Sequence, residues 1–272
     1  MTRPDIAFWT NKLQKRQNRP MVADLLDVNK LVREVQETAD LAIRVRPIKR
    51  PMVMTYSDSS LCNTSGDVVP DVSDFDTWTK EEKHKVRSQA GCLVAVIGRD
   101  EEESTHDTKC SVLGWKTAAM KRVVTSTFAA ETGVALSSCG CGLFCRALLA
   151  NILYGDEVSV LDWNEDRVPI RLLTDCKSLY DRVLKEGSLP DDRWTAIHVC
   201  ALKGVISAGP QRDQSKAGLR WVNSQCQCAD GLAKEGLHDS MRRMLTESCV
   251  RLHEISAQEA KRQYADRKTR RI

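Results

Sequence analysis

The order of apolar segments between residues 51 and 237 is the feature that most constrains the fold of this chain. Three strand-like segments come first, a long helix-like segment follows, and the order then runs strand, helix, helix, strand and helix. The segments are 51–58, 90–98, 109–117, 127–151, 169–174, 176–186, 192–206, 218–223 and 228–237. Strands and helices in such an order predict an α/β domain, with helices packed on a sheet. Strands 90–98 and 109–117 share one short acidic connection, so we expect them to be antiparallel neighbours.

An extension flanks this order on each side. Residues 1–50 predict a helical leader, because apolar residues between 22 and 43 recur on one helix face. Residues 239–272 predict a basic, helical C-terminal extension, whose charges favour a solvated face over a nucleic-acid-binding arm. We therefore expect the main α/β domain to cover 51–238.

Charge, leader composition and cysteine usage indicate the compartment. The net charge of +4 permits a polyanionic partner without requiring one. We recognise no signal peptide and no apolar run long enough to span a bilayer, so we expect an intracellular protein, cytoplasmic or nuclear, that is not secreted and has no membrane partner. The 11 cysteines lie mostly in apolar runs and are expected to pack as small hydrophobes. The clusters 139–145 and 226–228 lack the C-x2-C spacing of common zinc modules, which disfavours a zinc site.

Four acidic residues stand at the ends of predicted elements. Asp58 ends the first strand, and Asp175 ends the strand 169–174. Glu131 lies in the first turns of the long helix, and Asp230 lies at the start of the last helix. Each one alone is explained as a helix cap or as a partner of the helix dipole. In open α/β sheets, however, ligands bind at the carboxyl ends of strands, so four such residues in one domain indicate a site.

Gathered carboxylates indicate a particular chemistry. Carboxylates within a few ångströms repel one another, which raises some of their pKa values. Hard divalent cations relieve that repulsion, and Mg²⁺ prefers oxygen ligands and keeps several waters. Two such ions can clamp the attacking and leaving oxygens of a phosphoryl displacement. A carboxylate cluster without His or Cys therefore favours Mg²⁺ or Mn²⁺ and phosphodiester chemistry over zinc hydrolysis.

Several segments that carry these acids resemble the end of a copia-type retrotransposon Pol polyprotein, from the tail of its reverse transcriptase through its ribonuclease H domain. The match extends over residues 1–237. The segments are TRPDIAFWTNKL, MTYSDSS, SVLGWKTAAMKRVVTSTFAAETGVALS, LLTDCKSL and LRWVNSQCQCADGLAK. Their order and spacing make the resemblance more specific than any single motif.

The resemblance implies a ribonuclease H-like fold, with a five-stranded mixed sheet whose first three strands are antiparallel, flanked by helices. It implies that Asp58, Glu131, Asp175 and Asp230 are catalytic ligands of two Mg²⁺ ions, with Mn²⁺ as a substitute. The implied activity is endonucleolytic hydrolysis of the RNA strand of RNA–DNA hybrids. Residues 1–50 correspond to a remnant of the reverse transcriptase thumb or connection, and the ancestral partner is the polymerase domain.

The chain also departs from the family pattern. Where the family has Glu-Ala-Glu, this chain has Ala129-Ala130-Glu131 and so keeps only one of the two acids. The loop 208–218 has no histidine, and we expect His198 to be a packing or surface residue. No Tyr-x-Asp-Asp motif is present, so we expect a retrotransposon-derived fragment without the polymerase active site.

Candidate substrate contacts follow from the predicted elements. Lys121, Arg122 and Lys177 lie near the expected site and could meet phosphates, although each is also explained as an ordinary surface cation. A hybrid duplex would be held through phosphate and 2′-hydroxyl contacts, with little sequence specificity.

Two other functions stay open at the level of sequence. One is a catalytically inactive retroelement relic that at most binds nucleic acid. The other is an integrase-type strand transferase of the same superfold, which fits less well because such enzymes use three acids and a neighbouring zinc-binding domain.

Overall fold

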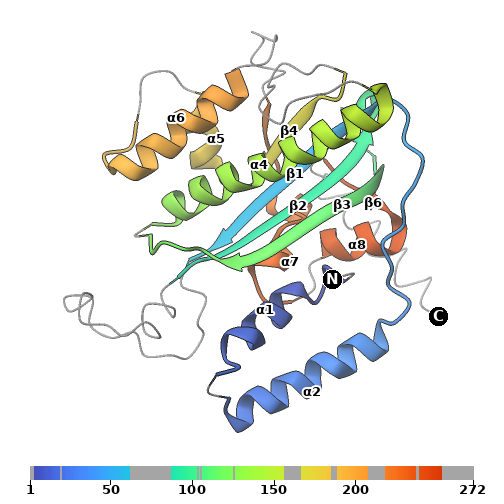
Figure 1. Cartoon of the computed structure of the whole chain (residues 1–272), viewed down its shortest axis with the longest axis vertical. Coiled ribbons are helices and arrows are strands. Elements are labelled where there is room, and N and C mark those ends of the chain that lie inside the picture. The colour runs from blue at the N-terminus through green and yellow to red at the C-terminus, as the bar shows by residue number, and fades with distance from the viewer. Residues whose placement is uncertain are drawn as a thin grey trace, which may run out of the picture.

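The chain folds into a mixed six-stranded sheet with helices on both faces (Figure 1). This computed structural model describes residues 3–18, 20–61, 87–102, 104, 106–124, 126–155, 167–184, 189–207, 218–236 and 239–252. The sheet order is β5-β4-β1-β2-β3-β6. The predicted α/β class with a mixed sheet is therefore confirmed.

Three long strands form the antiparallel part of the sheet. They are β1 (Pro51–Ser60), β2 (Gln89–Gly98) and β3 (Thr108–Ala119). β1 pairs antiparallel with β2, and β2 pairs antiparallel with β3, with a register shift between Val94 and Ala95. The predicted antiparallel arrangement of the first three strands is thus confirmed.

Three short strands complete the sheet. β4 (Ile170–Thr174) pairs parallel with β1, and β5 (Leu219–Trp221) pairs parallel with β4. β6 (Cys249–Val250) pairs antiparallel with β3 at the other edge. The prediction of five strands was wrong, because β6 has two residues, too few to show the alternation that indicates a strand.

β1 is a central strand whose two faces enter different parts of the core. All ten of its residues are buried. Met52, Met54 and Tyr56 point into one hydrophobic cluster, while Val53 points into another with Val96 of β2. Because both faces are covered, the last residues of β1 are also buried.

The long helix α4 (Thr127–Tyr154) covers one face of the sheet, as predicted for 127–151. Its first turn is capped by Ser126, whose side chain accepts a hydrogen bond from the backbone N–H of Ala129. It ends at Gly155, which has a left-handed backbone with φ of 68°.

α4 lies very close to β1 at one glycine. A Cβ on Gly142 would lie 2.1 Å from Oγ1 of Thr55, so this position has no room for a side chain. The helix is also apolar and long enough to span a membrane by length and composition, with half of that apolar window buried in the fold. A core helix of a soluble protein has the same features, and the absence of a membrane partner stays a prediction.

The other helices divide between the two faces, as Figure 1 shows. α5 (Lys177–Leu184) and α6 (Arg193–Ser207) lie on the side of α4. α1 (Ala7–Lys15), α7 (Asp230–Ala233) and α8 (Asp239–Glu247) lie on the opposite side, and α2 (Val22–Glu37) contacts α1. Two 3-10 turns, η2 (Arg99–Glu101) and η4 (Ser224–Cys226), lie in connections.

The leader differs from its prediction. The single helix expected over 22–43 ends at Glu37, and α1 was not predicted. The apolar Leu41 and Ile43, which suggested more helix, lie outside any helix or strand and pack against the cluster around Met52 and Met54. The apolar spacing in this region therefore serves a tertiary contact instead of a helix face.

The C-terminal extension is described only as far as Leu252. That part holds α8 and β6, and Met241, Met244 and Val250 share the hydrophobic cluster of β1. The predicted boundary at 238 therefore does not coincide with a break in the core. Residues 253–272 lie outside the described part of the chain.

Candidate metal centre

Three elements meet where the strands β1 and β4 end. β1 and β4 are parallel neighbours, so their carboxyl ends lie together, and Asp58 and Asp175 stand at those ends. α7 begins at Asp230 and packs on β2, where a Cβ on Gly91 would lie 2.7 Å from the carbonyl oxygen of Ala229. Because Gly91 is the register partner of Asp58, this close approach brings Asp230 beside Asp58.

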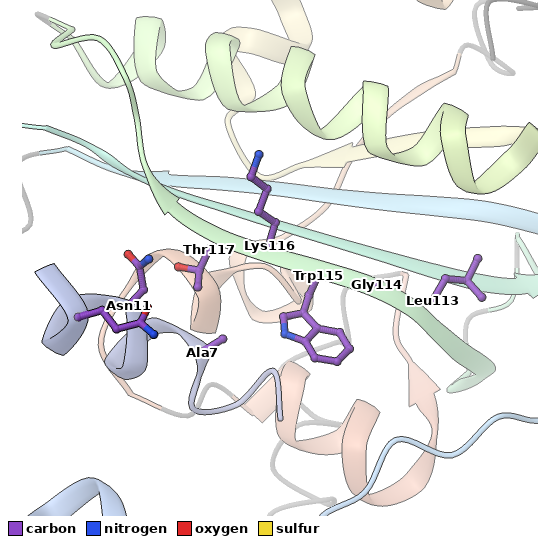
Figure 2. Close-up of a pocket in the computed structure, with 8 residues that line it drawn as sticks. Ala7, Asn11, Leu113, Gly114, Trp115, Lys116 and Thr117 are labelled. Atoms are coloured by element: carbon purple, nitrogen blue, oxygen red, sulfur yellow. The ribbon is translucent and has the colours of Figure 1, made fainter. Parts of the chain in front are cut away.

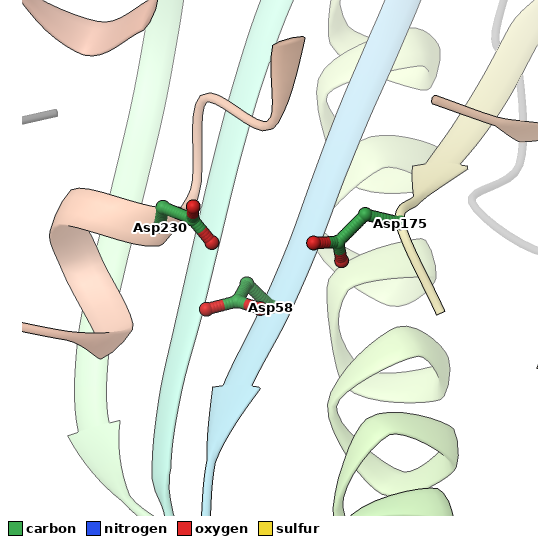
Figure 3. A group of neighbouring side chains, drawn as sticks. All are labelled: Asp58, Asp175 and Asp230. Carbon is green, nitrogen blue, oxygen red and sulfur yellow. The ribbon is translucent and has the colours of Figure 1, made fainter. Parts of the chain in front are cut away.

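Three of the predicted ligands converge (Figure 3). Asp58, Asp175 and Asp230 each offer one carboxylate oxygen, and these oxygens lie within 4.8 Å of one another. Asp58 is 1% exposed and Asp230 is 7% exposed, while Asp175 is half-buried. Such a group could hold a metal ion.

Glu131, the fourth predicted ligand, borders this triad from α4. Its side chain is buried, and Oε1 accepts hydrogen bonds from the backbone N–H of Ser59 at 3.1 Å and from the hydroxyl of Ser59 at 2.8 Å. It is not a member of the group within 4.8 Å, but its charge acts directly on Asp58. The structure therefore brings all four acids to one place, three of them within mutual ligand distance.

The electrostatics of the four acids reflect their crowding. Burial raises the pKa of Asp58 to about 9, and repulsion by Glu131 and Asp230 adds to the shift. Burial also raises the pKa of Glu131 to about 7, with repulsion by Asp175 adding to it and the bonds from Ser59 opposing it. Without added positive charge, the site cannot keep all of its carboxylates ionised at neutral pH.

Two buried oxygens make the fit to a cation specific. Oδ2 of Asp58 and Oε2 of Glu131 have no hydrogen-bond partner in the described part of the chain. Buried polar atoms in native structures are normally satisfied, so two orphaned oxygens in one acidic cluster indicate a missing partner. The donor set is oxygen alone, which suits a hard divalent cation.

Lys234, which we did not predict as a site residue, already places one positive charge here. Its Nζ donates to Oδ1 of Asp58 at 3.2 Å and to Oδ1 of Asp230 at 2.9 Å. Burial lowers the pKa of Lys234, but the two carboxylates outweigh burial and leave that pKa raised. The available signal was spacing, since Lys234 follows Asp230 by four residues, one turn of a helix.

Gln227 is a second unpredicted residue, fully buried behind the triad. Its Nε2 donates to the carbonyl oxygen of Ser57 at 3.0 Å and lies 3.5 Å from Oδ1 of Asp175. Its Oε1 accepts from the backbone N–H of Ala229 at 3.2 Å. Gln227 therefore ties the end of β1 to the start of α7, and nothing in its sequence context marked it.

The predicted substrate contacts lie on the surface. Lys121 is exposed, and the guanidinium of Arg122 lies over the ring of Trp194, 4.3 Å from its centroid. Nζ of Lys177 donates to Asp181 at 2.6 Å. None of the three belongs to the triad, and their contact with substrate stays a prediction.

Two further expectations concern the region before the last aspartate. His198 is half-buried in α6, in agreement with a packing role. The loop 208–218 has no histidine in its sequence, and all of it but Gly218 lies outside the described residues.

A separate hollow of about 530 Å³ lies on the other side of the sheet, between α1 and β3 (Figure 2). Its lining residues include Asn11, Trp115 and Thr117. None of the lining residues is an acid, a histidine or a cysteine, so this hollow lacks the side chains that usually bind a metal ion.

Comparison of the chain with known proteins gave no match among family models, curated proteins or solved structures. The proposed function therefore rests on the geometry of the site and on the resemblance of the sequence segments.

Proposed function

We propose that this chain is a metal-dependent nuclease that hydrolyses the RNA strand of RNA–DNA hybrids. The observation that carries the proposal is the triad of Asp58, Asp175 and Asp230, with one oxygen of each within 4.8 Å of the others. Glu131 adds a fourth acid with an orphaned buried oxygen. An all-oxygen set of this kind favours Mg²⁺ over zinc, with Mn²⁺ as a substitute.

Sheet and site together support a ribonuclease H-like fold for the domain. Such a fold is expected to begin with three antiparallel strands, and β1, β2 and β3 are antiparallel. The four acids stand at the end of β1, in α4, after β4 and at the start of α7, which are the element ends named by the copia-type resemblance. The fourth acid, Glu131, is the reason to prefer this nuclease over an integrase-type strand transferase of the same superfold, which uses three acids.

Each residue has a defined part in the proposed reaction. Asp58, Asp175 and Asp230 would hold the cations, and Glu131 would offer Oε2 while Ser59 fixes Oε1. Gln227 positions Asp175 and the start of α7. The chemistry that two bound Mg²⁺ ions supply is a more acidic water and charge stabilisation at the reacting phosphate.

The substrate class follows from surface chemistry and resemblance. Lys121, Arg122 and Lys177 are exposed cations that we propose as phosphate contacts. Phosphate contacts of this kind fix the position of a duplex and carry no base-sequence information. We therefore expect cleavage with little sequence preference.

The decisive test is cleavage of a labelled RNA–DNA hybrid by the full chain, with Mg²⁺, with Mn²⁺ and with EDTA. We expect Asp58→Asn and Asp175→Asn to lower the rate at least about a hundredfold, because loss of cation charge stabilisation is worth several kcal/mol. The matched control is Asp100→Asn, since Asp100 is an exposed aspartate paired with Arg50, on another part of the surface.

Single-stranded RNA, duplex DNA and duplex RNA complete the design. Metal-dependent cutting of only the RNA strand of the hybrid, lost in Asp58→Asn and kept in Asp100→Asn, is the expected result. A folded protein that binds Mn²⁺ but cuts none of the four substrates would instead be an inactive relic that at most binds nucleic acid.

A further inference from the structure

Lys234 holds an unusual place for a lysine. Its ammonium lies between two carboxylates that are both members of the triad, 3.2 Å from Asp58 and 2.9 Å from Asp230. The side chains of Asp58 and Asp230 are 2% and 10% exposed, while that of Lys234 is 39% exposed. The lysine therefore enters the site from its solvent side.

The oxygens that accept hydrogen bonds from this ammonium are also candidate ligands of a divalent cation. Oδ1 of Asp58 and Oδ1 of Asp230 both accept from Lys234. A divalent cation bound to these oxygens would stand a few ångströms from the ammonium, where like charges repel strongly in a partly buried site. The two cations therefore compete for the same two oxygens.

The local chain allows the lysine to leave. Lys234 directly follows α7, and the next two residues, Glu235 and Gly236, are exposed. Gly236 has φ of 101°, a left-handed backbone that favours glycine. A lysine stem is flexible and its ammonium is strongly hydrated, so a rotamer change can return the charge to water.

We propose that Lys234 is the resident counter-ion of the metal-free site, and that divalent metal binds by displacing it into solvent. The inference rests on the proposed function, because it takes the triad as a metal site. Its content is that Lys234 sets the metal affinity of the chain and stabilises the fold when metal is absent. An ordinary structural ion pair would stabilise the fold without changing the metal affinity.

The first test measures Mn²⁺ binding to the full chain without substrate. The readout is the electron paramagnetic resonance signal of free Mn²⁺. We expect Lys234→Met to bind Mn²⁺ about tenfold more tightly or better, because a competing charge has gone. In EDTA the same variant should melt at a lower temperature than the parent, and Mn²⁺ should raise its melting temperature more than that of the parent.

The matched control is Lys177→Met. Lys177 also follows an acid of the triad closely and forms an (i,i+4) pair, but with Asp181, outside the triad. The variant Lys177→Met therefore also removes one positive charge close to a triad residue. Equal Mn²⁺ affinity in Lys234→Met and Lys177→Met would overturn the proposal.

A second test needs no substitution. The amine of Lys234 is labelled by reductive methylation in the parent chain, with and without Mg²⁺, and its modification is followed by mass spectrometry. We expect metal to speed labelling of Lys234 and to leave labelling of Lys177 unchanged. Labelling of Lys234 that stays constant while metal saturates the site would overturn displacement, even if Lys234→Met fails to fold.

The two proposals fail separately. Tighter Mn²⁺ binding by Lys234→Met with no hybrid cleavage by the parent would support the counter-ion and end the nuclease assignment. Hybrid cleavage by the parent with unchanged Mn²⁺ binding in Lys234→Met would do the reverse.

Discussion

Asp58 is the residue of the site whose ionised form is the least favourable. It is almost fully buried and lies beside three other acids. Within the described residues, Lys234 contacts one of its two oxygens and the other has no hydrogen-bond partner. Burial alone disfavours its charged form, and its neighbours disfavour it further. The residue therefore lowers the stability of the metal-free protein whenever it is ionised.

The stability of the metal-free chain should accordingly fall as pH rises. The pKa of Asp58 is raised from 3.8 to about 9. Between these values the folded chain keeps a proton that the unfolded chain has released, so raising the pH favours unfolding. The stabilisation is complete below the ordinary pKa and is lost as pH passes through the raised one.

Urea denaturation in EDTA at several pH values measures this slope, which is at most about 1.4 kcal/mol per pH unit for one group. Asp58→Asn should flatten it, and Asp100→Asn should not. Glu131 contributes in the same direction, up to a pKa of about 7. Identical slopes in the parent and Asp58→Asn would contradict the buried, repelled carboxyl.

At this scale the sequence indicates the four gathered acids better than it indicates the residues that contact them. The four acids could be predicted because each stands at an element end, where the direction of the chain already limits where the side chain can lie. Lys234 and Gln227 could not, because their contacts with Asp58 and Asp175 depend on how α7 packs on β2.

At the scale of elements, α4 shows two glycines with opposite roles. Gly142 lies against Thr55 and Ile170, with no space for a Cβ, whereas Gly140 is exposed and has nothing within 4 Å of that position. Helix propensity treats both alike, as positions that weaken the helix. Only packing separates them.

The pair makes an internally controlled prediction. Gly140→Ala should raise the free energy of unfolding by up to about 1 kcal/mol, through helix propensity alone. Gly142→Ala should lower it by about 1–3 kcal/mol, because overpacking pushes α4 away from β1. Urea denaturation of both variants measures the difference, and equal effects of the two substitutions would contradict the close contact.

At the scale of the whole molecule, one core joins segments from both ends of the described chain. Ala7 of α1, Met54 of β1 and Met241 of α8 belong to the same hydrophobic cluster. The chain from α1 to β6 should therefore unfold as one unit, including residues beyond the predicted boundary at 238.

Met241→Ala tests this directly, since Met241 is fully buried. It should lower the free energy of unfolding by about 2–5 kcal/mol in a single transition, seen alike by circular dichroism and tryptophan fluorescence. Arg242→Ala, at an exposed position in the same helix, should have little effect. Separate melting of α8 before the sheet would contradict a shared core.

Long periodic elements of this fold could be read from the sequence, and short ones could not. The cap at Ser126 and the apolar run after it predict α4 closely, and alternation through Met52, Met54 and Tyr56 predicts β1. β6 and α1 exist because they pack on β3, and a two-residue strand or a short, mostly polar helix leaves little periodic signal.

The contact between Lys234 and Asp58 joins residues 176 positions apart. A ribosome that has made β1 to α4 has therefore produced Asp58 and Glu131 without the residues that complete their site. If the chain is the proposed nuclease, a growing chain cannot cleave its surroundings, because assembly of the centre waits for α7, which is translated after all but the last elements of the described fold. The long-range topology thus delays the gathering of the four acids until the described fold is nearly complete, and the proposed activity would begin only then, without any separate inhibitor.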